Sequence, residues 1–394
     1  MLRLLAAAAR VIVADRRSAP LRYSLGTALV AATVFGGEPR RFEIRNLETV
    51  SETTGGVSIG DINEDGHLDI LLLKGRHWPL KSVVLLGDGK GNFKPGALLP
   101  QEGNGNRTYS APLTDLNGDG HLDFILSNDK PDAKLVFFGD GKGNFRPAGT
   151  FGEAAWNTRN ACVADLNGDG SPDIVAANRG GPCWICFNDG KGNFPASRQV
   201  KLGPEGSSNL VAGDMDGNGS LDLIVAGRDN EQCVVYLNDG KGQFSRKVPF
   251  GPKVASTRAI AVADMNGDGK LDIIACHEKL GTFIYLNQGP SGFAAGTNLA
   301  GADAVPYSLI ATDLDGDGAP EIVVGFIKAP LVIFWNDGTG RKFTQSKFGD
   351  GQGGIYAIAV ADVNRDGLLD LVTARSDAPS FLLLQMKAAP TSAK

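Results

Sequence analysis

A nine-residue loop with oxygen-bearing side chains at fixed positions recurs seven times in this 394-residue chain. In one copy Asp264, Asn266, Asp268 and Asp272 stand at positions 1, 3, 5 and 9, and a glycine stands at position 6. Successive copies start 54, 50, 49, 50, 49 and 49 residues apart, at Asp61, Asp115, Asp165, Asp214, Asp264, Asp313 and Asp362. A regular period of this length is typical of propellers and solenoids, whose small units bury a core only by stacking.

The side chains of this loop predict calcium as the ligand. Ca²⁺ takes roughly six to eight oxygen ligands, and a sharp turn at a glycine lets alternate residues face one ion. An EF-hand would close its loop with a glutamate between two helices, whereas these loops run directly into strand-like apolar segments. We expect up to seven Ca²⁺ ions, one for each loop. The expected ligands are Asp61, Asn63, Asp65, Asp69, Asp115, Asn117, Asp119, Asp123, Asp165, Asn167, Asp169, Asp173, Asp214, Asp216, Asn218, Asp222, Asp264, Asn266, Asp268, Asp272, Asp313, Asp315, Asp317, Glu321, Asp362, Asn364, Asp366 and Asp370.

Negative charge is concentrated in these loops, because 22 of the 44 Asp and Glu residues stand at the expected ligand positions. The formal net charge of −5 therefore understates a local clustering of carboxylates, which repel one another when no cation is bound. Lysine and arginine form no stripe interleaved with aromatic side chains. Nucleic acid is therefore not an expected partner.

Each repeat reads as four short strands. In the fifth repeat these are residues 259–263, then 271–275 after the loop, then 283–286, and a fourth strand that follows a glycine-containing turn. In most repeats that turn has the form seen at residues 188–194, with Asp-Gly and Gly-Asn pairs that suit a tight hairpin. Four antiparallel strands make one blade of a propeller. The chain is therefore predicted to be all-β, a seven-bladed β-propeller with four antiparallel strands in each blade.

The two ends of the repeat region predict how the propeller closes. The last repeat ends with the apolar residues 381–384 and has no fourth strand, whereas residues 41–45 form a strand-like segment before the first repeat. Pairing these segments would complete the last blade with the N-terminal strand and remove two exposed sheet edges. The predicted domain boundaries are residues 38–387 for the propeller and 388–394 for a flexible tail.

Residues 1–37 lie outside the repeats and are predicted to be a signal peptide or an N-terminal anchor. Arg16, Arg17 and Arg22 precede the apolar residues 25–35, a run that is short for a transmembrane helix. A cleaved signal is the first interpretation, and an uncleaved anchor or a mis-assigned start remains open. We expect a secreted protein, extracellular or periplasmic, that is a monomer with no integral membrane domain in the mature chain.

Five cysteines lie in the central third of the chain, and Cys183 and Cys186 form a CxxC pair. The pair stands where other repeats have a strand, and residues three apart in a strand point to opposite faces. Buried, unpaired cysteines are expected, with a disulfide to a neighbouring strand as an open alternative. The odd number and the absence of a second CxxC do not favour zinc.

Segments such as residues 163–170 (VADLNGDG) followed by 172–175 (PDIV) resemble FG-GAP/VCBS repeats. The resemblance covers about residues 38–387. It implies the calcium-loop propeller of integrin α subunits and of related bacterial and fungal proteins. Asp216 and Asn218 exchange the usual order, and Glu321 replaces the ninth-position Asp. Because no further domain follows the repeats, we do not expect an integrin-like receptor. Related propellers include a sugar-binding lectin and some polysaccharide lyases, so the resemblance leaves function open.

The face opposite the calcium loops differs from repeat to repeat, as a ligand surface would. Arginine and aromatic side chains gather there, and a guanidinium binds carboxylate or sulfate with two parallel hydrogen bonds. We therefore expect a binding or adhesion module for a glycan or protein ligand. The alternative is a lyase-like, polysaccharide-active enzyme that uses an Arg/His/Tyr ring at the channel mouth. The candidate ligand-binding residues are His77, Trp78, Arg107, Tyr109, Arg159, Arg179, Arg228, Arg258, His277, Tyr307, Tyr356 and Arg375.

Overall fold

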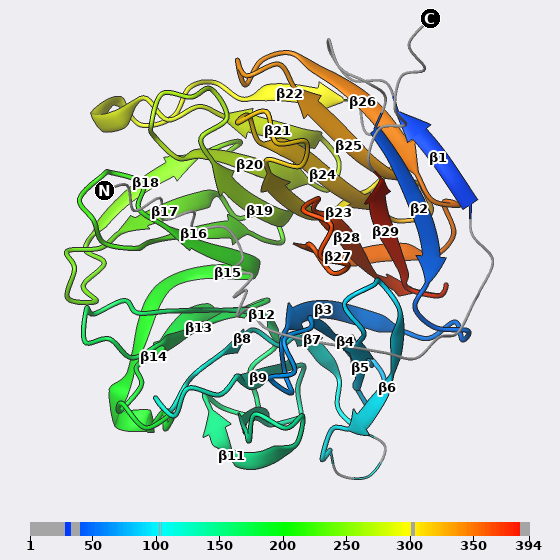
Figure 1. The fold of residues 1–394 in the computed structure, drawn as a ribbon. Coiled ribbons are helices and arrows are strands. Elements are labelled where there is room, and N and C mark those ends of the chain that lie inside the picture. Colours follow the sequence, from blue (N-terminus) through cyan, green and yellow to red (C-terminus); the bar gives the residue numbers. More distant parts are fainter. Residues whose placement is uncertain (1–27, 33–39, 102, 104, 301–303, 387–394) are drawn as a thin grey trace, which may run out of the picture.

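The computed structural model describes residues 28–32, 40–101, 103, 105–300 and 304–386, and its sheets are arranged around a central axis (Figure 1). The described part is all-β as predicted, apart from two short 3₁₀ helices, Ala196–Arg198 and Gly289–Ser291. Within these residues no helix is long and apolar enough to cross a bilayer. The whole predicted tail and most of the predicted signal segment lie outside the described residues.

Three repeats form separate four-stranded antiparallel sheets, as the sequence predicts. Their strands are β3 (Thr54–Gly60), β4 (Asp69–Lys74), β5 (Val83–Gly87) and β6 (Phe93–Leu98); β19 (Thr257–Ala263), β20 (Asp272–His277), β21 (Gly281–Tyr285) and β22 (Thr297–Ala300); and β23 (Pro306–Thr312), β24 (Glu321–Phe326), β25 (Leu331–Asn336) and β26 (Phe343–Phe348).

The second repeat has its first strand in two parts, since β7 and β8 both pair with β9. The third and fourth repeats share one seven-stranded sheet, because the 15-residue β15 pairs with β14 near its start and with β16 near its end. These strands are β7 (Thr108–Ser110), β8 (Leu113–Thr114), β9 (Asp123–Asn128), β10 (Lys134–Gly139), β11 (Phe145–Phe151), β12 (Thr158–Ala164), β13 (Asp173–Asn178), β14 (Pro182–Cys186), β15 (Gln199–Gly213), β16 (Asp222–Gly227), β17 (Cys233–Leu237) and β18 (Arg246–Phe250).

The last sheet joins the two ends of the described chain. It contains β27 (Gly354–Ala361), β28 (Asp370–Ser376), β29 (Phe381–Met386), β2 (Arg40–Asn46) and β1 (Ala28–Ala32). β2 pairs antiparallel with β29, so the predicted closing strand is confirmed. Phe42 of β2 is fully buried, and its ring lies 5.0 Å from that of Phe348 in the neighbouring sheet.

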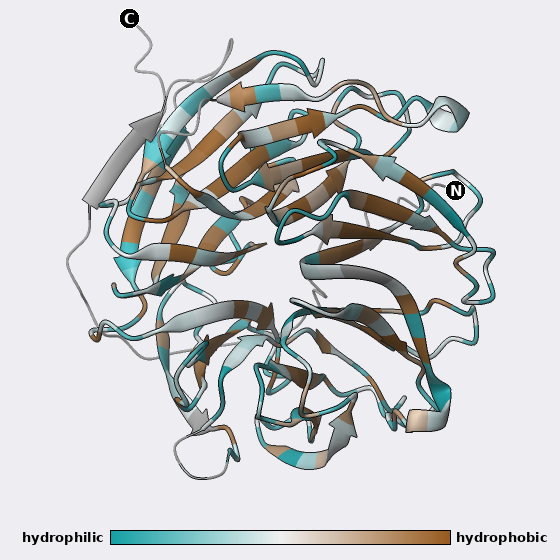
Figure 2. Ribbon diagram, turned by 180° about the vertical axis from the view of Figure 1, so that it is seen from behind, coloured by the Kyte–Doolittle hydropathy of each residue, from teal (hydrophilic) through white to brown (hydrophobic). Residues whose placement is uncertain are grey.

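The first strands of successive repeats form a closed ring around the axis. β3, β7, β12, β15, β19, β23 and β27 contact one another in this order, and β27 contacts β3. The second strands behind them, such as β4, β9 and β20, are buried along their whole length. Neighbouring sheets cover both of their faces, and so these strands read as continuous apolar runs instead of alternating ones. Figure 2, which views the molecule from behind, shows hydrophobic residues along the strands and hydrophilic residues in many connecting loops.

Side-chain amides tie neighbouring sheets together beside the calcium-loop motifs. Four asparagines that follow a third strand each donate to a backbone carbonyl in the preceding repeat's loop. The bonds are Asn188 Nδ2 to Leu116 O (2.9 Å), Asn238 Nδ2 to Leu166 O (2.8 Å), Asn287 Nδ2 to Met215 O (2.9 Å) and Asn336 Nδ2 to Met265 O (2.9 Å). The loops are thus part of the packing between sheets.

No disulfide joins any two of the five cysteines, all of which are described, and four of them are buried in strands, which confirms the strand interpretation of the CxxC pair. Cys183 and Cys186 both belong to β14. Burial raises the pKa of the Cys186 and Cys276 thiols to about 12, so both are protonated at neutral pH.

Candidate functional site

A β-bulge interrupts every first strand, at the end of the ring opposite the nine-residue acidic loops. The pairing register shifts there in β3, β7, β12, β15, β19, β23 and β27. A bulge inserts an extra residue that is unpaired and re-aims its side chain. The bulged residues are Gly55, Tyr109, Arg159, Ser208 with Asn209, Arg258, Tyr307 and Tyr356.

Several of these bulged residues surround one cavity of about 350 Å³, which we call the axial pocket. The remaining wall comes from the loops that follow the second strands and from one loop before β23. The lining residues are Arg76, His77, Arg159, Arg179, Ser208, Arg228, Arg258, Glu278, Val305, Tyr307, Ile327 and Tyr356. The pocket therefore combines five guanidinium groups, two phenol rings and a small apolar patch.

Arg76 reaches the axis because Gly55 has no side chain. A Cβ atom on Gly55 would lie 2.6 Å from Arg76 Cγ, and Arg76 itself has a φ of 44° in the left-handed region. Its guanidinium carbon lies 3.5 Å from the ring centroid of Tyr356, and 5.7 and 5.8 Å from those of Tyr109 and Tyr307. Arg76 thus fills the position that a bulged side chain occupies in the other repeats.

Two arginines of the pocket wall are paired with aspartates of neighbouring loops. Arg179 donates from Nε and Nη2 to the two carboxylate oxygens of Asp229, at 2.8 and 2.9 Å. This pair is bidentate and raises the pKa of Arg179. Arg159 Nη2 lies 3.1 Å from Asp129 Oδ2. Burial, together with the neighbouring guanidinium groups, lowers the pKa of Arg159 to about 10, so it is still charged at pH 7.

Glu278 bridges two further arginines. It accepts a hydrogen bond from Arg228 Nη1 at 2.7 Å and another from Arg258 Nη2 at 2.5 Å. Arg258 Nη1 also donates to the hydroxyl of Tyr307 at 3.2 Å. Burial opposes ionisation of Glu278, but its two arginines outweigh that effect and lower its pKa. Both oxygens of this carboxylate are therefore engaged by the protein.

Five of the residues that line this pocket each carry a buried polar atom without a hydrogen-bond partner. These atoms are the Nε atoms of Arg76, Arg159, Arg228 and Arg258 and the Oγ atom of Ser208. A buried donor that lacks a partner costs about 1–3 kcal/mol, and most such donors in proteins are satisfied by water, an ion or a ligand. The pocket thus presents unused hydrogen-bonding capacity.

His77 stands at the pocket wall as a neutral side chain. Burial, with the charges of Arg76 and Arg159 next in effect, lowers its pKa to about 4. The hydroxyl of Tyr109 lies 3.0 Å from His77 Nδ1, and the ring of Tyr109 also supports Arg159, whose guanidinium carbon is 4.4 Å from the ring centroid. Tyr109 therefore positions two lining residues without lining the pocket.

The structure brings together seven of the twelve ligand candidates from the sequence: His77, Arg159, Arg179, Arg228, Arg258, Tyr307 and Tyr356. Trp78 is outside the lining and 68% exposed, and Arg107 pairs instead with Asp132 at 2.8 Å. The other five lining residues, Arg76, Ser208, Glu278, Val305 and Ile327, were not among the candidates. Ser208 lies six residues before the first aspartate of its loop, as Arg159 and Arg258 do, and this spacing is the sequence signal that would have identified it.

His277 is fully buried, so its prediction as a ligand residue is wrong. It pairs in register with Thr257, as Asn128 pairs with Thr108 in an earlier repeat. Its Nδ1 lies 2.9 Å from Thr257 Oγ1, and its Nε2 lies 2.7 Å from the hydroxyl of Tyr285. The histidine thus replaces a structural asparagine inside its sheet.

Arg375 is likewise buried, with a relative exposure of 2%, and is not a lining residue. Its Nε donates to the carbonyl of Pro379 at 2.6 Å, and its Nη1 donates to Asp350 at 2.5 Å. Because these bonds hold two loops of the last sheet together, its prediction as a ligand residue is also wrong.

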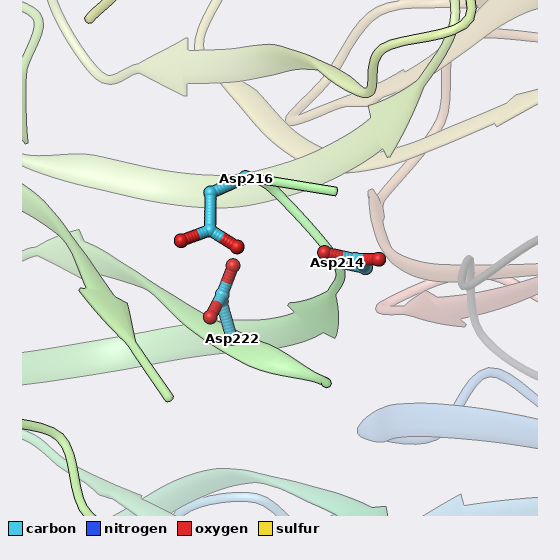
Figure 3. A group of neighbouring side chains, drawn as sticks. All are labelled: Asp214, Asp216 and Asp222. Atoms are coloured by element: carbon cyan, nitrogen blue, oxygen red, sulfur yellow. The ribbon is translucent and has the colours of Figure 1, made fainter. Parts of the chain in front are cut away.

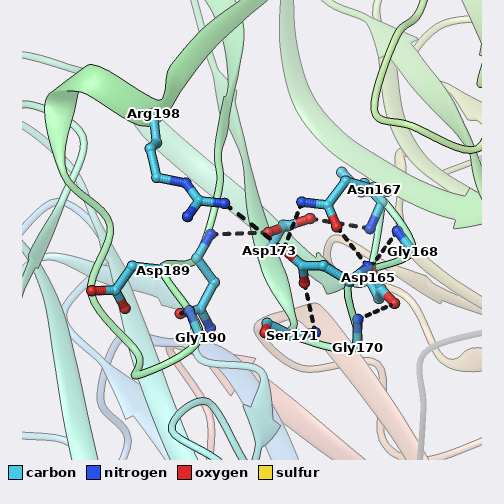
Figure 4. A network of polar contacts seen from close by, with 12 residues as sticks. Asp165, Asn167, Gly168, Gly170, Ser171, Asp173, Asp189, Gly190 and Arg198 are labelled. Carbon is cyan, nitrogen blue, oxygen red and sulfur yellow. Dashed lines mark hydrogen bonds and ion pairs between the residues drawn. The ribbon is translucent and has the colours of Figure 1, made fainter.

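The calcium-loop motifs lie at the other end of the same strands, where each first strand turns into the second. In the third loop, Asp165 accepts from the backbone N–H groups of Gly168 (2.8 Å) and Gly170 (3.0 Å). Asn167 Oδ1 accepts from the N–H of Asp169 at 2.8 Å, and Asp169 accepts from that of Ser171 at 2.9 Å (Figure 4). These bonds fold the loop so that its oxygens converge on one side.

The ninth-position acid of every loop is fully buried and fastens the hairpin. Each accepts one backbone N–H from position 2 of its loop and another from the residue after the third strand or at its end, as Asp173 does from Leu166 (3.1 Å) and Asn188 (2.9 Å). Burial is the main cause that raises their pKa values, with neighbouring loop carboxylates adding to it. The values are about 7 for Asp69 and Asp370, about 6 for Asp123, Asp173, Asp222 and Asp272, and about 8 for Glu321.

The loops fit a divalent cation by their chemistry. Asp61 Oδ1 is buried without a hydrogen-bond partner. Asp214, Asp216 and Asp222 each place an oxygen within 4.8 Å of the others, and Figure 3 shows their carboxylates gathered at the loop. Asp313, Asp315 and Asp317 form a second such group. A cation between these carboxylates would favour their ionised forms, against the burial and mutual repulsion that oppose them.

Comparison with protein-family models shows what these repeats are. The FG-GAP-like repeat matches residues 61–126, 115–176, 165–225, 214–275 and 313–373, and each match begins on the first aspartate of a loop. The chain belongs to the FG-GAP-like repeat family. The resemblance inferred from the loop motif is therefore confirmed. No curated protein matches the chain significantly.

Solved structures similar to this FG-GAP-like chain support a β-propeller. A lectin from Agrocybe aegerita, described as recognising non-reducing terminal N-acetylglucosamine, is 21% identical, with a TM-score of 0.57 over 84% of this chain and 87% of its own. The lectin BP39L from Burkholderia pseudomallei is 14% identical, with a TM-score of 0.60 over 86% and 97%. BBS1N, solved in complex with ARL6DN, is 11% identical, with a TM-score of 0.59 over 88% and 96%. At these identities the similarity concerns the fold.

Proposed function

We propose that this FG-GAP-like protein is an exported, calcium-loaded, seven-bladed β-propeller that binds glycans through the axial pocket. The blade count treats β15 as two strands, one for the third blade and one for the fourth. The observation that carries the binding proposal is the set of buried pocket donors without partners, from four arginines and Ser208. Two lectins among the similar structures are consistent with a glycan as the ligand.

The dimensions of the pocket favour a sugar over a protein surface. A cavity of about 350 Å³ is at the lower end of the range for small-molecule sites, about 300–1,000 Å³. Sugar hydroxyls accept from guanidinium and serine donors, while the rings of Tyr307 and Tyr356 offer aromatic faces to C–H groups. A flat protein partner would instead need roughly 800 Å² on its side of the interface.

Calcium has a structural role in this proposal. The ion would supply positive charge between the loop carboxylates, with ligands from positions 1, 3, 5 and 9 of each loop. The chain's own residues position it: the ninth-position acid is anchored by two backbone N–H groups, and the glycines allow the tight turn. Extracellular calcium is abundant enough to fill sites of modest affinity, so metal loading agrees with export through the N-terminal segment.

The same pocket gives less support to a lyase. His77 is the one histidine that lines it, and a base with a pKa of about 4 provides little driving force for proton abstraction at neutral pH. His277, the second base considered from the sequence, is buried inside its sheet. Binding without turnover is therefore the function that we propose.

A glycan array tests the proposal directly. The purified propeller, kept in calcium, should be retained by a defined set of oligosaccharides, and Arg258→Gln should reduce that retention. Arg258 lines the pocket, whereas the exposed Arg341 lies at the opposite end of the sheets. Arg341→Gln is therefore the matched control. Retention of no oligosaccharide, or equal retention of both variants and wild type, would contradict the axial site. A screen of uronic polysaccharides for ultraviolet absorbance would reveal any eliminative cleavage.

A further inference from the structure

Positive charge exceeds negative charge around the axial pocket. Five arginines line it, whereas the acids that pair with them are three: Asp129, Asp229 and Glu278. Asp229 is taken by a bidentate bond, and both oxygens of Glu278 are occupied. Among the residues that the structure describes, the acids of the pocket therefore leave an excess of two guanidinium charges.

Arg76 is the arginine of this cluster for which the described residues provide no acid. It is 8% exposed and forms no ion pair with a described carboxylate. Its hydrogen bond from Nη1 to Ser376 Oγ is long at 3.5 Å. The face of Tyr356, 3.5 Å from the guanidinium carbon, offsets part of the cost of burying this charge. A buried charge ordinarily has an opposite charge beside it, and an anion at the axis would provide one.

The unpartnered donors of the pocket residues are groups that bind oxyanions. The Nε atoms of Arg76 and Arg258 are buried and unpartnered, and so is Ser208 Oγ, which comes from a bulge on the first strand between those carrying Arg159 and Arg258. Guanidinium groups bind carboxylate and sulfate through parallel charge-assisted hydrogen bonds. Several fixed donors that surround one cavity favour a compact anionic group over a neutral hydroxyl.

The rest of the wall favours an anion that is carried by a sugar. Tyr307 and Tyr356 pack edge to face with centroids 4.3 Å apart, and Val305 and Ile327 add apolar surface beside them. A bare inorganic ion would not use this apolar and aromatic wall. A sugar ring would, because its C–H faces pack on aromatic rings while its charged substituent meets the arginines.

We propose that the axial pocket selects acidic sugars, with the carboxylate or sulfate ester of one sugar residue held by Arg76 together with the unpartnered donors of Arg258 and Ser208. This inference rests on the proposed glycan-binding function and names the class of glycan.

The test compares matched ligands by isothermal titration with the full chain in calcium. The probes are trigalacturonate, its methyl ester, a trisaccharide that carries a sulfate ester, and inorganic sulfate. Wild type should bind at least one of the two acidic sugars about 10- to 100-fold more tightly than the neutral ester. Tighter binding of trigalacturonate would identify a carboxylate as the anionic group, and tighter binding of the sulfated trisaccharide would identify a sulfate ester.

Two pocket variants and one control make the outcome specific. Arg76→Gln should reduce the acidic-to-neutral preference about 10-fold or more, and Arg341→Gln should leave it unchanged. Because Arg76 is buried, its replacement changes packing as well as binding. Ser208→Asp is therefore the second variant, since it adds a carboxylate beside the arginines. It should retain or raise the melting temperature and abolish the preference for acidic sugar.

Each result either supports or overturns the inference. An acidic preference that both pocket variants remove supports it. Equal affinity for trigalacturonate, its ester and the sulfated sugar overturns it but leaves glycan binding standing. Binding of inorganic sulfate without either acidic sugar overturns the sugar assignment. Retention of no oligosaccharide on the array overturns this inference and the proposed function together.

Discussion

Replacing His277 by asparagine should make the protein less sensitive to acid. His277 is fully buried between Thr257 and Tyr285, and its burial lowers its pKa to about 4. Asparagine occupies the equivalent position in two other repeats, where Thr108 and Thr158 donate to the amide oxygens of Asn128 and Asn178 at 2.8 Å. An uncharged side chain that fits this environment is thus already present in the protein.

The magnitude follows from the difference between the folded and unfolded pKa values. The unfolded histidine titrates near 6.5 and the folded one near 4, so only the unfolded state gains a proton between these values. The free energy of unfolding therefore falls as the pH drops below about 6.5 and levels off below about 4. The full loss is about 3 kcal/mol, of which about 2 kcal/mol is lost between pH 7.5 and pH 5.

The assay is urea unfolding of wild type and His277→Asn in saturating calcium from pH 7.5 to pH 5. The variant should be less stable at pH 7.5 by about 1–2 kcal/mol, because it loses the bond to Tyr285 and leaves a small void. This deficit should shrink by about 2 kcal/mol at pH 5. Using the difference between the two proteins removes the contribution of the loop carboxylates, which both share.

His121→Asn is the control, because Glu64 raises the pKa of that exposed histidine instead of lowering it. Such a histidine stabilises the folded state at low pH and loses that effect as the pH rises, so its removal should not reduce acid sensitivity. Parallel stability curves for wild type and His277→Asn across the whole pH range would refute the reasoning.

Three further results are expected. Chelation with EDTA should lower the melting temperature by at least ~5 °C, because the loops hold clustered acids and an ion at 100 times its Kd stabilises the folded state by about 2.7 kcal/mol. An unchanged melting curve would exclude structural metal. Phe42→Ala should lower the free energy of unfolding in urea by about 3–5 kcal/mol, because this buried ring packs the closing strand onto Phe348. A decrease below ~1 kcal/mol would mean that β2 does not close the last sheet. Cys186 and Cys276 should not react with Ellman's reagent at pH 8 until the protein unfolds, and rapid labelling of either thiol in the native protein would contradict the buried, protonated state.

Much of the fold could be predicted from the sequence because the repeat carries its own geometry. The spacing of the first aspartates predicts the size of each unit, and the missing last strand predicts the pairing of β2 with β29. The unbroken β15 was not foreseen. Residues 199–213 contain three glycines and a proline, which suggest a loop, yet the strand runs through them from one repeat to the next.

The axial pocket was only partly predictable, because the bulges that build it depend on strand pairing. The sequence placed Arg375 and His277 after a second strand, as it did Arg179 and Arg228, but the structure includes Arg375 and His277 in β28 and β20 and buries both. The absence of a side chain on Gly55 of β3 makes room for the long side chain of Arg76, which comes from the loop after β4. This contact depends on the folded structure and is not visible in the sequence. Comparing His277 with its counterpart Asn178 in the earlier repeat could have identified it as structural.

A diffraction map of the protein crystallised with the oligosaccharide that binds most tightly on the array tests the central claim most directly. We predict density for one sugar residue in the axial pocket, within hydrogen-bond distance of Arg258 and Ser208 and packed beside Tyr307 and Tyr356. Density in a crevice between sheets or at the calcium loops, with the axial pocket holding only water, would contradict the account.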